Sequence, residues 1–441
     1  MTAEWFKPRP YKHFDLPVDE SFAAKVVDPS FVSRHAFSPL IHYDKIDVRY
    51  KKDPKSGIRK IVRKPRPIKY ASHRDACILS YYSYLLSQAL ASQYGKHEFG
   101  ESVIAYRALG RSNYHFSAEA LAFAVSNAPV MILAFDVTGF FDNLDHGLLK
   151  RRLKSVLNVT SLSSDWHKVL RFVTRFHFVR LDVLQSHPVF GPRHKEKGLR
   201  RIASVKELKE ASIAFEPNPE ITKVLARGIP QGTPISASLS NLYMIDFDAA
   251  AASFCSKIGA LYRRYSDDIL VICKVEQAGA AEAEILRLIA AERLEIAAHK
   301  TEKTLFNKGV STIRTSKAAQ YLGFTFDESG AAIRESSLAR QWRKMRRAIK
   351  RTRAVAMIKI AGGKSNKVHT KRLYRRFTFL KVNNGDSIRA LRNFSSYGRR
   401  SAEAFDNKVK ILSQIRRFEN AALRELAELK KIWLPPPPAT P

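Results

Sequence analysis

Residues 261–273 read Leu-Tyr-Arg-Arg-Tyr-Ser-Asp-Asp-Ile-Leu-Val-Ile-Cys, and the interpretation of the whole chain depends on this stretch. Aromatic and apolar residues lead into Tyr265, Asp267 and Asp268 follow, and an apolar run continues to Cys273. The pattern predicts a buried hairpin with two carboxylates at its turn. Adjacent buried carboxylates repel each other and lose hydration unless a cation lies beside them, and Mg²⁺ is the natural candidate. A solvated Asp-Asp turn explains the stretch equally well on its own.

The charge of the chain predicts a polyanionic partner. Its 441 residues include 76 Lys and Arg against 41 Asp and Glu, a formal net charge of +35. Nucleic acid is the simplest such partner. An anionic membrane surface is disfavoured, because the basic residues are spread along the chain and no amphipathic helix stands out. Hydrophobic residues make up 45% of the chain, which excludes global disorder.

Several absences favour a cytoplasmic protein. The first residues lack the apolar region of a secretory signal. No apolar run approaches the ~20 residues that a membrane helix needs. Cys77, Cys255 and Cys273 lie far apart in apolar surroundings, so we expect reduced core residues and neither a zinc site nor a disulfide framework.

A third aspartate follows a second apolar run. Residues 130–135 read Val-Met-Ile-Leu-Ala-Phe and lead into Asp136, which predicts a strand covered on both faces with a candidate metal ligand at its carboxyl end. A helix is expected next, with Asp142 as its N-cap. Polymerases need carboxylates on neighbouring strand ends to hold two metal ions. Asp136, Asp267 and Asp268 fit that need, and the solvated-turn alternative becomes less favoured.

Basic residues in the first quarter of the chain suit phosphate contact. Residues 51–75 predict a basic hairpin with a Pro-Lys-Ser-Gly turn and a proline-rich exit, followed by a helix over 76–94. Arg66 and Arg74 would lie on this rigid element, and guanidinium groups bind phosphate well. Arg107 and Arg111 lie in a glycine-containing loop before a helix expected from about Ser117, a setting that suits template contact. A solvated charged hairpin is the alternative for residues 51–75.

In chain order, these segments and others resemble a reverse transcriptase of the bacterial group II intron and retron type, over roughly residues 55–330. The matching residues are Arg66-Pro-Ile and Arg74-Asp75; Ser102, Tyr106-Arg107 and Gly110-Arg111-Ser112; Phe135-Asp136, Gly139-Phe140-Phe141-Asp142 and His146; Gly228-Ile-Pro-Gln231-Gly-Thr-Pro and Asn241; Tyr265-Ser-Asp-Asp268; Leu294 and Lys300-Thr301; and Tyr321-Leu-Gly-Phe324. Any one match could arise by chance, whereas seven in order are specific.

The resemblance implies an α+β fold of the right-hand polymerase type. Its parts would be an N-terminal extension (1–50), fingers (51–128), a palm of antiparallel sheet plus helices (129–330, with a basic insertion at about 180–225), and a helical basic thumb with a C-terminal extension (331–441). A strand is expected at residues 321–326, helices at 148–157, 166–178 and 280–293, and a polyproline tail at 435–438.

The resemblance also implies a role for each matching residue. Asp136 and Asp267 would ligate two Mg²⁺ ions, with Mn²⁺ as a substitute, and Asp268 and the Val137 carbonyl would assist. Lys300, or Lys303 nearby, would donate a proton to pyrophosphate. The other implied contacts are Arg66 and Arg74 with the incoming triphosphate, Gln231 with the nucleotide, Phe141 against a ribose 2′-hydroxyl, and Arg107, Arg111 and Tyr265 with template and primer.

The implied activity is RNA-directed DNA polymerase, with an RNA template, deoxynucleotides and a DNA product. The template could be a dedicated non-coding RNA, and the oligomeric state stays open. Departures from the family pattern narrow the type of reverse transcriptase. The chain lacks an Asn-Ala-x-x-His segment, and neither a Val-Thr-Gly segment nor a nuclease signature follows the palm. These favour a free-standing enzyme like those of phage defence. A maturase-like or retron-associated RNA-binding protein and an untemplated, protein-primed polymerase remain alternatives.

Overall fold

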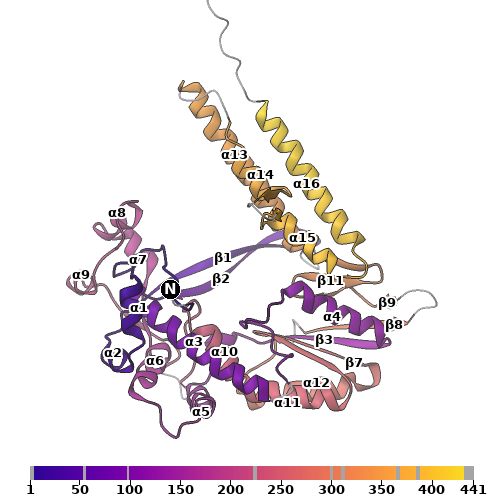
Figure 1. The fold of residues 1–441 in the computed structure, drawn as a ribbon, viewed down its shortest axis with the longest axis horizontal. Helices are drawn as coiled ribbons and strands as arrows, with labels where there is room; N and C mark the ends of the chain where they lie inside the picture. The colour runs from indigo at the N-terminus through magenta and orange to yellow at the C-terminus, as the bar shows by residue number, and fades with distance from the viewer. Residues whose placement is uncertain are drawn as a thin grey trace, which may run out of the picture. The chain divides into compact units, whose positions relative to one another are not determined.

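The computed structural model describes residues 4–52, 56–96, 99–221, 226–297, 301–308, 313–363, 368–383 and 388–431 (Figure 1). The chain forms two compact units made of interleaved segments. The first comprises Met1–Arg107, Ala134–Val271 and Gly279–Thr301, and the second comprises Ala108–Leu133, Ile272–Ala278 and Glu302–Pro441. Helices and mostly antiparallel sheets occur together, which agrees with the predicted α+β class. The predicted domain boundaries stay a prediction.

A long basic hairpin dominates the N-terminal part of the first unit. Strands β1 (Leu40–Lys52) and β2 (Arg59–Tyr70) pair antiparallel along their whole length, as predicted. Two short strands, β4 (His177–Arg180) and β5 (Glu216–Pro217), extend the sheet in the order β2-β1-β4-β5. The proline-rich exit belongs to β2 itself, because β2 is an edge strand, where a missing N–H costs no ladder hydrogen bond.

Helices make up most of the rest of the first unit. Their bounds are α1 (Glu20–Val26), α2 (Pro29–Arg34), α3 (His73–Lys96), α5 (His146–Val156), α6 (Ser164–Thr174), α7 (Leu181–Ser186), α8 (Phe190–Lys195), α9 (Val205–Glu210), α10 (Ser236–Tyr243), α11 (Ile245–Lys257) and α12 (Ala278–Ala291). Helices α3 and α12 confirm the predicted helices at 76–94 and 280–293. Helix α10 carries the small residues that follow the Gly/Pro loop.

A five-stranded sheet carries the candidate site. Its order is β6-β7-β3-β8-β9, from β6 (Leu261–Tyr265), β7 (Asp268–Lys274), β3 (Val130–Asp136), β8 (Glu302–Lys308) and β9 (Ile313–Thr315). The apolar runs of β3 and β7 form its buried centre, since Leu133, Val271 and Ile272 are fully buried. The sheet therefore presents the ends of two buried strands where the sequence places aspartates.

The second unit ends in helices. It holds α4 (Asn113–Ser126), the strands β10 (Ala319–Tyr321), β11 (Phe324–Asp327), β12 (Gly330–Ile333), β13 (Lys381–Asn383) and β14 (Ile388–Ala390), and the helices α13 (Glu335–Ala361), α14 (Lys371–Phe377), α15 (Phe394–Glu403) and α16 (Val409–Lys430). Helices α13 and α16 run side by side (Figure 1) around a core that includes Met345, Phe377 and Phe418. Residues 335–430 are mostly helical, as the sequence predicts, and their role as a thumb stays a prediction.

Some element boundaries differ from those expected. The helix expected over 166–178 ends at Thr174, because Phe178 joins β4. The helix expected from Ser117 begins at Asn113, where Ser112 and His115 form a capping box. The strand expected over 321–326 is a hairpin, with a turn at Leu322 and Gly323, both at positive φ.

Asp142 was expected to be the N-cap of the following helix, and this prediction is wrong. Asp145 takes that place by accepting from Leu148 N at 2.8 Å. Asp142 instead ends the short 3₁₀ helix η1 (Phe140–Asp142). The three cysteines are free and buried, as predicted. Among the described helices, none combines the length and apolarity needed to cross a bilayer. Lys300 and the polyproline tail lie outside the described residues.

Candidate active site

The predicted hairpin turn is present at the junction of β6 and β7. Ser266 and Asp267 connect the two strands, with Ser266 in the left-handed region at φ 60°. Asp268 is the first residue of β7 and is exposed, whereas Asp267 is half-buried. The residues from Ile269 to Cys273 are all at most 1% exposed. The apolar run therefore fixes the strand in the core and leaves both carboxylates at its end.

The backbone after β3 lies directly beside this turn. Val137 N donates to the Asp267 carbonyl at 3.2 Å, and Ala297 N donates to the Asp136 carbonyl at 2.9 Å. Thr138 N donates to the Glu295 carbonyl at 2.8 Å. Asp136 thus lies between the aspartate turn and the segment that leads toward residue 300. Three stretches that are far apart in the sequence therefore meet through their backbones.

The donor chemistry suits a hard divalent cation. Carboxylate and carbonyl oxygens are the ligands that Mg²⁺ prefers, and Asp136, Asp267, Asp268 and the Val137 carbonyl offer only such oxygens. Within the described ranges, however, no group of three or more His, Cys, Asp or Glu side chains is gathered to hold a metal ion. The structure brings the backbones of the two segments together, and the assignment of metal ligands stays a prediction.

A fully buried arginine supports the aspartate turn from behind. Arg264 and Asp248 form an ion pair in which both side chains are 0% exposed. Arg264 Nε donates to Asp248 Oδ1 at 2.7 Å, and Nη2 donates to Oδ2 at 2.6 Å. The third donor, Nη1, bonds the Ser266 carbonyl at 2.9 Å. Burial alone would lower the pKa of Arg264, but the Asp248 carboxylate raises it above its usual value. Arg264 therefore stays charged and binds the Ser266 carbonyl, which directly precedes Asp267.

Further hydrogen bonds join this network to other matching segments. Asn241 accepts from Arg264 Nη2 at 3.3 Å and donates to the Ala105 carbonyl at 2.9 Å. The Arg264 backbone exchanges hydrogen bonds with Ser102 and Ile104. The Tyr262 hydroxyl donates to Asp248 at 2.6 Å, and burial together with that carboxylate raises the pKa of Tyr262. Sequence reasoning assigned no role to Arg264 or Asp248, although a charged residue inside an apolar strand calls for a buried partner.

The Phe141 and Gln231 segments are tied together by their backbones. Phe141 is half-buried in η1, and its carbonyl accepts from Ile229 N at 2.9 Å. The Gln231 carbonyl accepts from Lys69 N of β2 at 2.8 Å. Gly232 follows at φ +120°, where a Cβ would lie 2.9 Å from the Lys69 carbonyl oxygen. Only glycine suits so close an approach between the loop and β2.

Lys69 is a further residue that sequence reasoning missed. It is 8% exposed, and its ammonium lies 5.4 Å and 5.2 Å from the ring centres of Phe176 and Phe178. Burial lowers the pKa of Lys69, an effect that Asp142 opposes. Burial raises the pKa of Asp142, and the charge of Lys69 opposes that rise. A buried cation thus lies on the strand that supports the Gln231 loop and is electrostatically coupled to the carboxylate next to Phe141.

The predicted phosphate-binding arginines have different settings. Arg66 pairs with Asp47 at 3.0 Å and is 47% exposed. Arg74 is exposed in the first turn of α3 and lies 5.7 Å from the ring centre of Phe22. Both face solvent, and their triphosphate contact stays a prediction.

The residues predicted to contact template and primer also make contacts within the chain. The Arg107 guanidinium donates to the carbonyls of Gly100 and Val103 and lies 4.1 Å from the Tyr94 ring centre. These contacts stabilise the loop that carries Arg107. Arg111 pairs with Glu119. Tyr265 is 36% exposed, and its partial burial, with Tyr106 and Asp268 nearby, raises its pKa. Contact of these residues with template or primer stays a prediction.

Comparison with known proteins supports the sequence resemblance. The family model described as "Reverse transcriptase (RNA-dependent DNA polymerase)" matches residues 58–326. No curated protein matches the chain. With the mixed helices and sheets, the family match confirms the predicted α+β polymerase fold.

Solved structures similar to this chain include two yeast telomerases. The apo enzyme from Candida tropicalis, truncated from its C-terminal domain, has a TM-score of 0.38 and 11% identity, over 73% of this chain and 62% of that one. The Candida albicans enzyme with a fragment of telomeric RNA has a TM-score of 0.40 and 12% identity, over 94% and 65%. The chain thus spans less than two thirds of each telomerase chain.

Proposed function

This chain belongs to the reverse transcriptase family, and from that premise we propose that it is an RNA-directed DNA polymerase acting by two-metal nucleotidyl transfer. The observation that carries the proposal is the direct pairing of the Asp136–Val137 backbone with Asp267 and Ala297. This pairing supports the proposal because it joins the backbone at Asp136 both to the aspartate turn and to Ala297. A solvated loop would not need three distant segments to meet.

The residues divide the chemistry among them. Asp136, Asp267 and the Val137 carbonyl would hold the metal ions, with Asp268 beside them. Bound Mg²⁺ supplies the positive charge that activates a primer hydroxyl and stabilises the leaving pyrophosphate. Arg264 fixes the turn that carries Asp267. The Asp267 carboxylate would therefore keep one orientation throughout the reaction. Lys300 would donate the proton to pyrophosphate.

Phe141 is proposed to select deoxynucleotides. Its backbone is held by Ile229, and its half-buried ring would contact the sugar of the incoming nucleotide. We expect Phe141→Ala to lower the preference for dNTP over rNTP on the order of 10-fold to 100-fold, because the barrier to the 2′-hydroxyl is steric. The measurement is incorporation of each nucleotide type on one template.

Phe141→Tyr keeps the bulk of the ring and provides the matched control, so it should retain most of the preference. If Phe141→Ala selects dNTP as strongly as the wild-type protein, Phe141 is not the selecting residue.

The narrower proposal is a role in phage defence with a dedicated RNA template. It is supported by the sequence departures that disfavour intron-mobility and retron types. A maturase-like protein would keep its function when the aspartates are changed, and a protein-primed polymerase would leave its product covalently attached to the chain. Sequencing the nucleic acid that copurifies with the protein separates these cases.

A further inference from the structure

The N-terminal segment, residues 4–38, gathers around the start of helix α3. Helix α1 packs against α3, as Figure 1 shows. Within residues 71–79, all of which the structure describes, only Arg74 is exposed. Every other residue of that stretch is at most 5% exposed. Arg74 is therefore the one side chain that this buried turn presents to solvent, and its surroundings decide how firmly it is held.

Asp15 caps the N-terminus of α3 from outside the helix. Its Oδ1 accepts from His73 N at 2.9 Å, and its Oδ2 accepts from Arg74 N at 2.8 Å. The next backbone N–H, that of Asp75, donates to the Ser72 hydroxyl at 3.3 Å. The first N–H groups of a helix otherwise lack partners and attract anions. Since side chains of this chain occupy them, the Arg74 guanidinium is the phosphate donor left at this helix end.

The residues on both sides of the exposed arginine are anchored as well. The Tyr11 hydroxyl donates to the Ala71 carbonyl at 2.8 Å. The Asp75 carboxylate is fully buried, bonds His35 Nε2 at 2.7 Å and accepts from Ser38 N at 2.9 Å. The N-terminal segment thus holds the backbone of the first turn of α3 at several points.

A ring of the same segment contacts the guanidinium of Arg74. Its Cζ lies 5.7 Å from the ring centre of Phe22 in α1, a distance at which a cation is attracted to an aromatic ring. Phe22 packs edge-on against Phe31 of α2, with ring centres 5.7 Å apart and an interplanar angle of 77°. Among the residues that the structure describes, none forms an ion pair or a side-chain hydrogen bond with Arg74. The guanidinium is therefore oriented without being neutralised.

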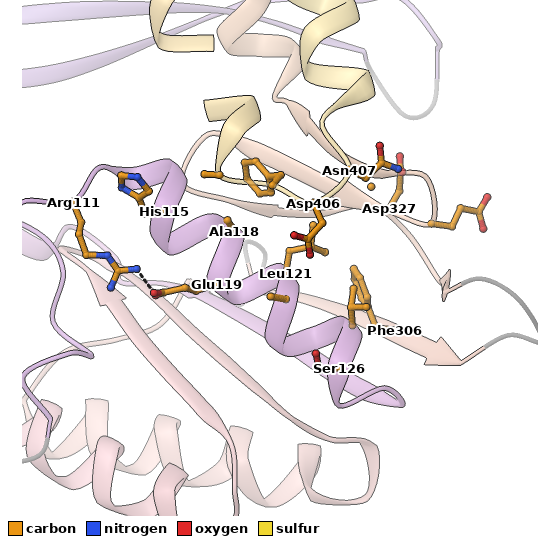
Figure 2. Close-up of a pocket in the computed structure, with 16 residues that line it drawn as sticks. Arg111, His115, Ala118, Glu119, Leu121, Ser126, Phe306, Asp327, Asp406 and Asn407 are labelled. Carbon is orange, nitrogen blue, oxygen red and sulfur yellow. Dashed lines mark hydrogen bonds and ion pairs between the residues drawn. The ribbon is translucent and has the colours of Figure 1, made fainter. Parts of the chain in front are cut away.

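Two other arginines predicted to bind phosphate or template have carboxylate partners. Arg66 pairs with Asp47 at 3.0 Å. Arg111 lines a pocket of ≈ 670 Å³ in the second unit and pairs with Glu119, as the dashed line in Figure 2 marks. An arginine paired in this way has to leave its carboxylate before it binds a phosphate, whereas Arg74 does not.

We propose that Asp15 and Phe22 are positioning residues for Arg74 and thereby set the affinity for the incoming nucleotide. Asp15 fixes the backbone from which the arginine extends, and Phe22 orients its guanidinium. A side chain that is held in advance loses less conformational entropy on binding, so the gain appears as affinity. This inference rests on the proposed function, because it needs Arg74 to contact a triphosphate. It assigns a role to residues 4–38, for which the sequence indicates none.

The test is a double-mutant cycle that measures KM and kcat for one dNTP on one RNA template. Asp15→Ala should raise KM about 10-fold, within the range for loss of a helix cap. The kcat and the RNA affinity should stay unchanged, because the phosphate contact is made in the ground and transition states alike. In an Arg74→Ala background the same change should alter KM less than about twofold, since Asp15 acts through Arg74.

Phe22→Leu is a second probe, which keeps the cap and removes the ring. It should raise KM about 2-fold to 5-fold in the wild-type background, as loss of a cation–π contact allows, and leave KM unchanged in the Arg74→Ala background. Circular dichroism checks that each variant is folded, and this probe decides the matter if Asp15→Ala does not fold.

Asp28→Ala is the matched control. Asp28 is exposed in the same segment and caps α2 by accepting from Ser30 N at 2.8 Å, so the change removes the same charge and the same kind of cap away from α3. Its KM should stay within about twofold of the wild-type value, because sites without shared partners act independently.

The outcomes separate positioning from stability. Equal rises in KM in the wild-type and Arg74→Ala backgrounds, or for Asp15→Ala and Asp28→Ala, would show a structural role alone and overturn the proposal. A wild-type KM for folded Asp15→Ala would also overturn it. Absence of incorporation by the wild-type protein would instead overturn the proposed function, and this inference with it.

Discussion

The double change Asp267→Asn/Asp268→Asn is expected to abolish nucleotide incorporation while leaving RNA binding intact. Asparagine keeps the shape of both side chains but removes the charges proposed to hold Mg²⁺. The rate of incorporation should fall on the order of 10³-fold or more, as when a charged group that acts with others in one catalytic unit is removed. Single-turnover incorporation and RNA affinity, measured on the same preparation, check this result.

The control for this pair is Glu328→Gln/Asp406→Asn, which removes the same charge from two exposed residues that line a separate pocket of the second unit. It should incorporate nucleotides at the wild-type rate. Incorporation by Asp267→Asn/Asp268→Asn at more than about a tenth of that rate would contradict the metal-ligand assignment and favour an RNA-binding protein in which the palm is a scaffold.

Arg264→Met is expected to destabilise the fold by about 3–5 kcal/mol, since it leaves the fully buried Asp248 without its cation. The free energy of unfolding in denaturant measures this cost. A loss below about 1 kcal/mol would contradict the buried ion pair, because an exposed pair contributes no more than that.

The double variant Arg264→Met/Asp248→Leu separates stability from positioning. Replacing both charges by apolar side chains should recover most of the lost stability. Incorporation should stay reduced, because the Ser266 carbonyl no longer has the donor at 2.9 Å that fixes the aspartate turn. We expect kcat to fall while RNA affinity stays unchanged. Wild-type kcat in a double variant of recovered stability would show that Arg264 serves stability alone.

The strands of the candidate site could be predicted from the sequence because their signals are local. The apolar runs that end at Asp136 and begin after Asp268 are continuous, and a turn between two such runs allows few alternatives. The partners of Arg264 could not be predicted in the same way, since Asp248 and Asn241 lie on different helices whose packing decides the contact. Lys69 was missed for the same reason, because Gln231, Phe176 and Phe178 lie far from it in the sequence.

Local contacts matter at other predicted residues. Arg107 donates to carbonyls of its own loop, and its contact with the template stays a prediction. Asp142 and Asp145 both precede α5, which begins at His146, and the backbone geometry after η1 selects Asp145 as the cap. Propensity alone does not distinguish two aspartates three residues apart.

The most direct test of the central claim is primer extension by the wild-type protein on RNA templates that differ at one position, with Mg²⁺ and one dNTP at a time. Asp136 and the Asp267–Asp268 turn are proposed to form a site that copies RNA, so the template base should decide which nucleotide is added. The account predicts incorporation of the complementary dNTP alone at each template base, and none when Asp267→Asn/Asp268→Asn replaces the wild-type protein. Addition of the same nucleotide whatever the template base, or no addition by the wild-type protein on any RNA template, would contradict it.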